Sequence, residues 1–308
     1  MTPTQTAFVS SSPEGAVLAE SIFHDWNSLD VTGHFLARNI DTDEQLGFDI
    51  EIPVPLASVV KVPIALAVLE RTADGSLDPA QPLTVDPATS SLGPTGIAAF
   101  RYPATLAIGD LVYQMLAVSD NASGDTLLDL IGLDALGKRL RAWKCPGISV
   151  RHRLQRMHDC AVGAVGNDFG LALELAIQDD HFDGQHKIET LDIAHGNIGT
   201  ALALTDLLQR IWLDEIASPA ATAEMRRLMS QQVFTHRLSS DLRADTLTVS
   251  AKTGAFLHLR HEIGIIESDT GSRIAVAALT RSSRRASIAQ DIDLAIGAAA
   301  RAAFEHLR

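Results

Sequence analysis

The stretch of residues 55–67, PLASVVKVPIALA, decides how the rest of the chain is interpreted. Its apolar residues continue to Leu69 and predict a buried helix that begins near Ser58. The prolines at positions 53 and 55 push the residues before them toward extended geometry, so a loop precedes this helix. Ser58 and Lys61 are three residues apart in the first turn, and their side chains therefore share one face of the helix.

Ser58 and Lys61 have the chemistry of a nucleophile and its base. A hydroxyl at a helix N-terminus lies beside unpaired backbone N–H groups and the positive end of the helix dipole, which favours an oxyanion. The valines around Lys61 make its amine easier to deprotonate, as a general base requires. The alternative interpretation is a helix-capping serine and a lysine that reaches solvent, and S-x-x-K alone does not exclude it.

Two further short motifs follow in order along the chain. They are the turn Ser119–Asn121 (SDN) and the segment Lys252–Gly254 (KTG), which follows an expected strand. Together with S-x-x-K these motifs form the signature of class A β-lactamases and penicillin-binding proteins. The chain resembles this family over nearly its whole length, and three motifs in order are far more specific than one.

The resemblance implies a role for each motif in acyl transfer. Ser58 would be the nucleophile, Lys61 its proton acceptor, and Ser119 the group that passes a proton to the leaving nitrogen. Lys252 belongs to the same catalytic set. The backbone N–H groups of Ser58 and Ala255 would form an oxyanion hole, which stabilises charge in the transition state.

The resemblance also implies a set of substrate-binding residues. Asn121 would hydrogen-bond the amide of the substrate, and Lys252 and Thr253, with the adjoining Gly254, would bind its carboxylate. Arg260 resembles the family's arginine on the strand after the lysine motif, where a guanidinium helps to hold a carboxylate. An exposed strand arginine is the alternative interpretation of Arg260.

The residue that would release the acyl group has two candidate positions. In the family it is a glutamate in a loop, but the stretch after Ser119 is longer here than in compact members. Counting forward from Ser119 reaches residues 153–160, which contain His158 and no glutamate. Counting back from the next predicted helix reaches Glu189, with Asp192 in place of the family's asparagine. A histidine suits this chemistry because its ordinary pKa is about 6.5.

No cofactor or metal is expected. One group of residues has the side chains of a metal site, but its spacing fits no known pattern: His158, Cys160, Asp179, Asp180 and His181. Cys145 and Cys160 do not form a metal-type pair, and a disulfide between them is left open.

The predicted elements place strands at both ends of the chain and helices between them. We expect helices at 15–26, 58–73, 108–116, 124–131, 133–143, 202–213, 220–229 and 288–307, and strands at 31–38, 46–52, 246–250, 260–267 and 274–280. Residues 77–107 are expected to be loops, and residues 145–200 show little periodicity. This pattern predicts an α+β fold with an antiparallel sheet flanked by terminal helices. Residues 1–57 and 245–308 would form the sheet domain and residues 58–244 a mainly helical domain, with the active site between them.

The composition of the chain indicates which kinds of partner it can bind. The chain has 308 residues, is 46% hydrophobic and carries a net charge of −13, which argues against nucleic acid or an anionic membrane as a partner. The expected partner is a small molecule that carries a carboxylate, such as a β-lactam or an ester. Residues 1–6 lack the basic region and apolar core of a secretory signal, so a cytoplasmic location is expected. A secreted or periplasmic location would apply if a signal had been removed.

The sequence therefore favours a β-lactamase-like serine hydrolase that forms an acyl-enzyme on Ser58. An esterase or amidase on the same scaffold, acting in a biosynthetic pathway, is the first alternative. A penicillin-binding-type protein that deacylates slowly is the second.

Overall fold

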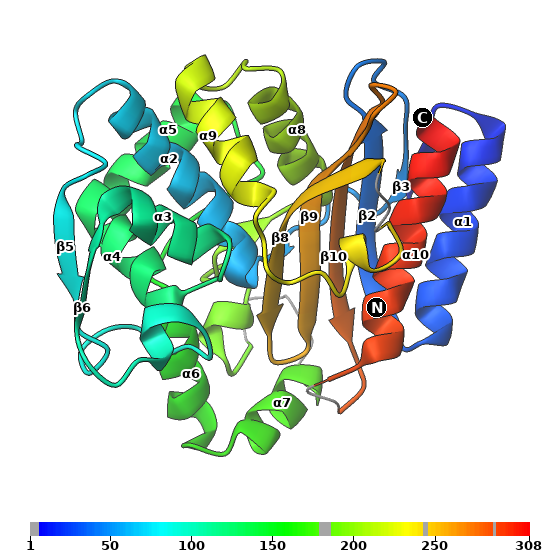
Figure 1. Ribbon diagram of the computed structural model, residues 1–308. Coiled ribbons are helices and arrows are strands. Elements are labelled where there is room, and N and C mark those ends of the chain that lie inside the picture. The colour runs from blue at the N-terminus through cyan, green and yellow to red at the C-terminus, as the bar shows by residue number, and fades with distance from the viewer. Residues whose placement is uncertain (1–5, 179–185, 243–245, 286–287) are drawn as a thin grey trace.

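The computed structural model describes residues 6–178, 186–242, 246–285 and 288–308 (Figure 1). Its centre is a six-stranded antiparallel sheet in the order β1-β3-β2-β10-β9-β8, so β8 lies at one edge. The strands are β1 (Phe8–Ser10), β2 (Val31–Asn39), β3 (Gln45–Phe48), β8 (Leu247–Phe256), β9 (Leu259–Ser268) and β10 (Arg273–Ser282). The α+β fold with an antiparallel sheet and terminal helices is confirmed.

The two faces of the sheet are covered by different helices. The terminal helices α1 (Pro13–Ser28) and α10 (Gln290–Leu307) lie side by side on one face (Figure 1). Trp26 of α1 packs edge-on against Phe35 and Phe48 at ring-centroid distances of 5.6 Å in both cases. The opposite face contacts α8 (Ala201–Trp212) and the short turn that carries Ser58. Because side chains alternate along a strand, the sheet separates two hydrophobic cores.

The helical layer surrounds α2 (Lys61–Ala73), whose first nine residues, 61–69, are all buried. The other helices of this layer are α3 (Ile108–Leu116), α4 (Asn121–Ile131), α5 (Leu133–Ala142), α6 (Gln155–Val165), α7 (Phe169–Gln178), α8 and α9 (Pro219–Met229). Side chains of Asp120, Thr200 and Ser218 cap the N-termini of α4, α8 and α9 by accepting backbone N–H groups. The division of the chain into two domains at residues 57 and 245 stays a prediction.

Several expected elements have different boundaries. The strand expected at 46–52 ends at Phe48, and the one expected at 246–250 continues through the KTG motif to Phe256. Residues 77–107 contain the short paired strands β5 (Pro82–Val85) and β6 (Ala104–Ala107) rather than loops alone. These differences arise because cross-strand pairing, which is a non-local contact, decides where a strand ends.

The poorly periodic stretch 145–200 contains α6 and α7, followed by strand β7 (Ile198–Gly199), which pairs with β4 (Val54–Pro55). Cys145 and Cys160 are both free thiols. Within the described ranges, no three His, Cys, Asp or Glu side chains are grouped to hold a metal ion, and Asp179, Asp180 and His181 lie outside those ranges. Among the described helices none is by itself long and apolar enough to cross a membrane. The helices α6 and α7, taken together and bent by 91°, pass that test of length and composition.

Candidate active site

Ser58 stands in a 3₁₀ turn, Ala57–Val60, immediately before α2. Ala57 has a φ of 46°, in the left-handed region that is unfavourable for a residue with a side chain. Strain of this kind costs about 1–3 kcal/mol and persists only where the surroundings hold the backbone. On one side of the turn, the N–H of Leu56 donates to the carbonyl of Asn197 at 2.8 Å.

His261 of β9 holds the other side of this turn. Its Nε2 hydrogen-bonds the carbonyl oxygen of Pro55 at 2.8 Å, and its Nδ1 lies 2.9 Å from the backbone N of Thr280. A backbone N–H can only donate, so Nδ1 is the acceptor and Nε2 carries the hydrogen. Burial lowers the pKa of His261 to about 3, and the ring is therefore neutral. Ser58 is thus presented by a strained turn anchored to the sheet.

The amine of Lys61 is fully buried at the centre of the cluster. Its Nζ donates to Ser58 Oγ at 3.0 Å, to the Ser119 carbonyl at 2.7 Å and to Asn121 Oδ1 at 2.7 Å. The Ser119 hydroxyl lies 3.3 Å from the same nitrogen. The structure therefore brings the S-x-x-K and SDN motifs together.

Burial lowers the pKa of Lys61 from 10.5 to about 7, although the negative charges of Asp120 and Asp125 oppose the shift. Near neutral pH a substantial fraction of this amine is uncharged. A neutral amine within hydrogen-bond distance of a hydroxyl can remove its proton, which is the geometry of a nucleophile and its base.

Lys252 completes the cluster from the edge strand β8. Its side chain is fully buried, and its Nζ donates to Ser119 Oγ at 2.9 Å and to its neighbour's carbonyl, Thr253 O, also at 2.9 Å. Burial, and next the charge of Lys61, hold the pKa of Lys252 well below its usual value. The Ser119 hydroxyl therefore lies between two amines, and Ser119 itself has a φ of 63°.

Gly254 is required by close packing of β8 against the Ser58 turn. A Cβ at this position would lie 2.9 Å from the carbonyl oxygen of Leu56 and 3.1 Å from the backbone N of Val59. Ala255 follows and is exposed. The KTG strand is thereby held directly beside the turn that carries Ser58.

Arg260 and Ala255 face each other across the β8–β9 ladder. Burial lowers the pKa of Arg260, and the next largest influences are the charges of Asp293 in α10 and of Arg237. Asp293 lies in α10, whereas Arg237 lies in the segment that precedes β8. Its assignment as a carboxylate-binding residue stays a prediction.

Glu189 and His158 occupy different surroundings. Glu189 is half-exposed and its carboxylate pairs with Arg156 at 2.5 Å. His158 lies on α6, with its ring edge-on to Phe256, the last residue of β8, at a centroid distance of 5.9 Å. Burial lowers the pKa of His158, which favours the neutral ring. In the described part of the chain, neither residue hydrogen-bonds Ser58.

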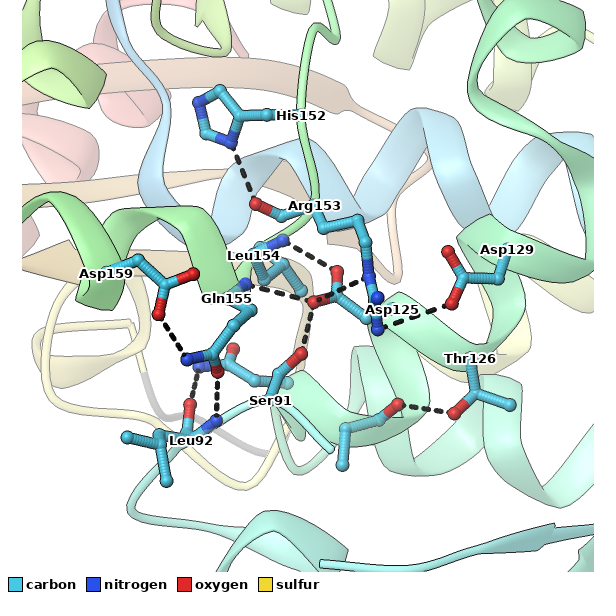
Figure 2. A network of polar contacts seen from close by, with 12 residues as sticks. Ser91, Leu92, Asp125, Thr126, Asp129, His152, Arg153, Leu154, Gln155 and Asp159 are labelled. Atoms are coloured by element: carbon cyan, nitrogen blue, oxygen red, sulfur yellow. Dashed lines mark hydrogen bonds and ion pairs between the residues drawn. The ribbon is translucent and has the colours of Figure 1, made fainter. Parts of the chain in front are cut away.

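A second polar network joins α4 to α6 (Figure 2). The carboxylate of Asp125, which is 1% exposed, accepts the N–H groups of Leu154 at 2.6 Å and Gln155 at 3.0 Å, and the hydroxyl of Ser91. Asp125 thus caps the helix that carries His158. Sequence reasoning missed this residue because no short motif marks it.

The site also has polar supports that the motifs do not contain, namely His261, Gln232 and Glu262. For His261 and Glu262, the only sequence signal is that a polar or charged residue stands in an apolar strand pattern, residues 259–266, LRHEIGII. Such residues need buried partners, but the sequence does not say which ones.

The sheet, the helical layer and the convergence of the three motifs define the fold class of β-lactamases and penicillin-binding proteins. The chain belongs to the β-lactamase enzyme family, whose family model matches residues 18–307.

The chain is similar in sequence to two relatives and in fold to two solved structures. The chain is 37% identical over 265 residues to the beta-lactamase regulatory protein BlaB of Streptomyces cacaoi, covering 82% of this chain and 85% of that protein. It is 32% identical over 125 residues to beta-lactamase VEB-1 of Pseudomonas aeruginosa, covering 39% and 41% of the two chains. A β-lactamase from Sphaerobacter thermophilus has the same fold, with a TM-score of 0.75 at 18% identity over 94% of this chain and 96% of that one. PBP-A gives a TM-score of 0.74 at 18% identity over 94% and 97%.

Proposed function

We propose that this chain is a serine hydrolase that is acylated on Ser58 by a β-lactam carrying a carboxylate. The observation that carries the proposal is the Lys61 amine, 3.0 Å from Ser58 Oγ and with a pKa lowered to about 7. Membership of the β-lactamase family supports the substrate class. The mutant of PBP-A solved as an acyl-enzyme complex with penicillin G supports it through the shared fold.

The proposed acylation uses each motif in turn. Neutral Lys61 takes the proton of Ser58 Oγ, which attacks the lactam carbonyl carbon and forms a C–O bond. The N–H groups of Ser58 and Ala255 stabilise the resulting oxyanion. The C–N bond of the ring then breaks, and the nitrogen receives a proton through Ser119, whose hydroxyl lies between Lys61 and Lys252.

The proposed substrate contacts rest on the family resemblance and, for Asn121, on its position beside Ser58. Asn121 Oδ1 is held by Lys61, and Nδ2 donates to the carbonyl of Leu92 at 2.7 Å, so the amide is fixed in orientation beside the nucleophile. We assign it to the amide of the substrate. Lys252, Thr253 and Gly254, with Arg260, are assigned to the substrate carboxylate.

Deacylation requires a base that activates water, and His158 and Glu189 are the two candidates. Glu189 is already paired with Arg156, whereas His158 packs on Phe256 at the end of the strand that carries Ala255. A stalled acyl-enzyme is a second candidate function. The observation that favours it is the 37% identity to a protein named as a β-lactamase regulator rather than as a β-lactamase.

One experiment separates these functions. The protein is incubated with a chromogenic cephalosporin and with a simple activated ester, while turnover and intact mass are followed. Steady cephalosporin turnover supports the β-lactamase, ester turnover alone supports an esterase, and a persistent mass increase supports stalling. Ser58→Ala should abolish every one of these signals, and a variant that still behaves like wild type would remove Ser58 from the mechanism.

Single substitutions then test the deacylation base. If His158 activates the water, His158→Ala should lengthen the life of the acyl-enzyme and leave the acylation rate unchanged. Glu189→Gln serves as the matched comparison, and the residue whose loss leaves deacylation unchanged is excluded.

A further inference from the structure

Gln232, in the segment after α9, forms hydrogen bonds on both sides of its amide group. Its Oε1 accepts the backbone N–H of Thr253 at 2.5 Å. Its Nε2 donates to Glu262 Oε1 at 2.7 Å and to the carbonyl of Phe234 at 2.8 Å. Gln232 therefore joins the KTG strand to a carboxylate of the next strand.

The orientation of this amide is determined by its partners. The N–H of Thr253 can only donate, so it must face the amide oxygen, and the amide nitrogen is left for Glu262. Glu262 is fully buried, and its second carboxylate oxygen accepts the N–H of Leu238 at 2.5 Å. Both oxygens of Glu262 are thus engaged, and a rotated Gln232 amide would place two acceptors together.

The position of this contact matters because β8 is the edge of the sheet. In an antiparallel edge strand every second N–H group points away from the neighbouring strand. The N–H of Thr253 points outward to Gln232, so the N–H of Ala255, two residues further along, also points outward. This is the donor that the proposed function assigns to the oxyanion hole.

The next residue connects the same segment to the second motif. The N–H of Val233 donates to the carbonyl of Ala117 at 3.0 Å, two residues before Ser119. Residues 232–233 therefore contact both the outer edge of β8 and the turn that carries Ser119. A segment held at two points in this way fixes the distance between the strand and the turn.

We propose that Gln232 and Glu262 are positioning residues. They hold the outer edge of β8, and with it the N–H of Ala255, in place beside Ser58. Neither residue belongs to a recognised motif. The inference rests on the proposed acylation of Ser58, because its consequence is a change in that rate.

The test exchanges the two side chains. Gln232→Glu places a second carboxylate against Glu262. Glu262→Gln leaves one acceptor oxygen in place of the two that accept the Gln232 amide and the N–H of Leu238. Each single variant should lower the first-order acylation rate constant, measured by intact mass with a chromogenic cephalosporin, by roughly tenfold or more. The concentration of half-saturation should change less, since the groups that contact the substrate remain.

The double variant Gln232→Glu with Glu262→Gln restores one carboxylate facing one amide and keeps an oxygen facing the N–H of Thr253; only the hydrogen bond to the Phe234 carbonyl is not restored. It should recover a large part of the acylation rate lost in the single variants. Glu267→Gln, which lies on the same strand outside this network, is the matched control and should acylate like wild type. If Gln232→Glu does not fold, Gln232→Met replaces it, because it removes the acceptor without adding charge.

The outcomes distinguish the two proposals. Wild-type protein that never gains mass on Ser58 contradicts the proposed function itself. Wild-type protein that acylates normally, together with single variants that acylate equally fast, overturns the positioning role alone. The positioning role is also overturned if the double variant acylates no faster than the slower single variant. In that case the loss of rate is purely structural, because exchanging the partners did not reverse it.

Discussion

At the scale of single residues, burial changes what a lysine can do. The Nζ of Lys61 has hydroxyl, carbonyl and amide oxygens as its hydrogen-bond partners. Such neutral acceptors stabilise an ammonium less than a paired carboxylate would, so desolvation lowers the pKa to about 7. Lys252 experiences the same desolvation together with the charge of Lys61.

The rate of Ser58 acylation should therefore increase with pH. The base must be neutral, so the rate should rise as pH increases through about 7 and level off above it, where Lys61 is deprotonated. Acylation measured by intact mass from about pH 5.5 to about pH 9 tests this. Lys61→Arg, which stays charged throughout this range, should acylate at least ~100-fold more slowly at every pH. A rate that falls across neutral pH would contradict the assignment of Lys61 as the base.

At the scale of elements, one buried carboxylate holds α6 against α4. Asp125 on α4 accepts the N–H groups of Leu154 and Gln155 at the start of α6, and the side chain of Gln155 in turn accepts the N–H of Leu92 at 2.8 Å (Figure 2). The helix that carries His158 and the loop that contacts Asn121 therefore share one support.

Asp125→Ala should destabilise the protein by about 1–3 kcal/mol, because two buried N–H groups and the Ser91 hydroxyl lose their acceptor. The free energy of unfolding in urea measures this change. Asp129→Ala is the control: its carboxylate lies one turn away, is about half exposed and pairs with Arg153. The two variants should differ clearly in stability, and equal values would show that the Asp125 contacts contribute little.

At the scale of the whole molecule, His261 connects the sheet to the segment that carries Ser58. One ring nitrogen accepts an N–H from β10, and the other donates to Pro55 before the Ser58 turn. The buried ion pair between Arg237 and Asp293, at 2.7 Å, similarly joins α10 to the segment before β8. Buried polar contacts of this kind link layers that are distant in sequence.

His261 should also contribute to acid sensitivity. Its pKa is about 3 in the folded protein and 6.5 in its ordinary state, so the unfolded chain binds the proton first as pH falls. Stability should decrease from about pH 6.5 downward, with a slope of at most ~1.4 kcal/mol per pH unit from this one residue. His261→Phe should be less stable at neutral pH and show a shallower slope. His24→Gln, at an exposed position on α1, should leave the slope unchanged. Urea unfolding at a series of pH values measures both.

The sequence by itself determined the local chemistry of this protein. The apolar run after Ser58 predicted a buried helix, because a helix with apolar residues on every side is stable only inside a core. The order of the three motifs predicted the family, and strand-like segments near both ends of the chain predicted most strands of the sheet.

Tertiary structure decided everything that depends on contacts between distant segments. Ser58, Ser119 and Lys252 meet only because the sheet and the helical layer close on each other. The same holds for the supports at Asp125, Gln232, His261 and Glu262, whose partners lie far along the chain or on neighbouring strands. Residues 145–200 could not be predicted for the same reason, since the start of α6 is held by the distant carboxylate of Asp125 and α7 packs against α6. A hydrogen bond between residues more than a hundred positions apart has no local sequence signal, and only the folded chain determines which polar groups face each other.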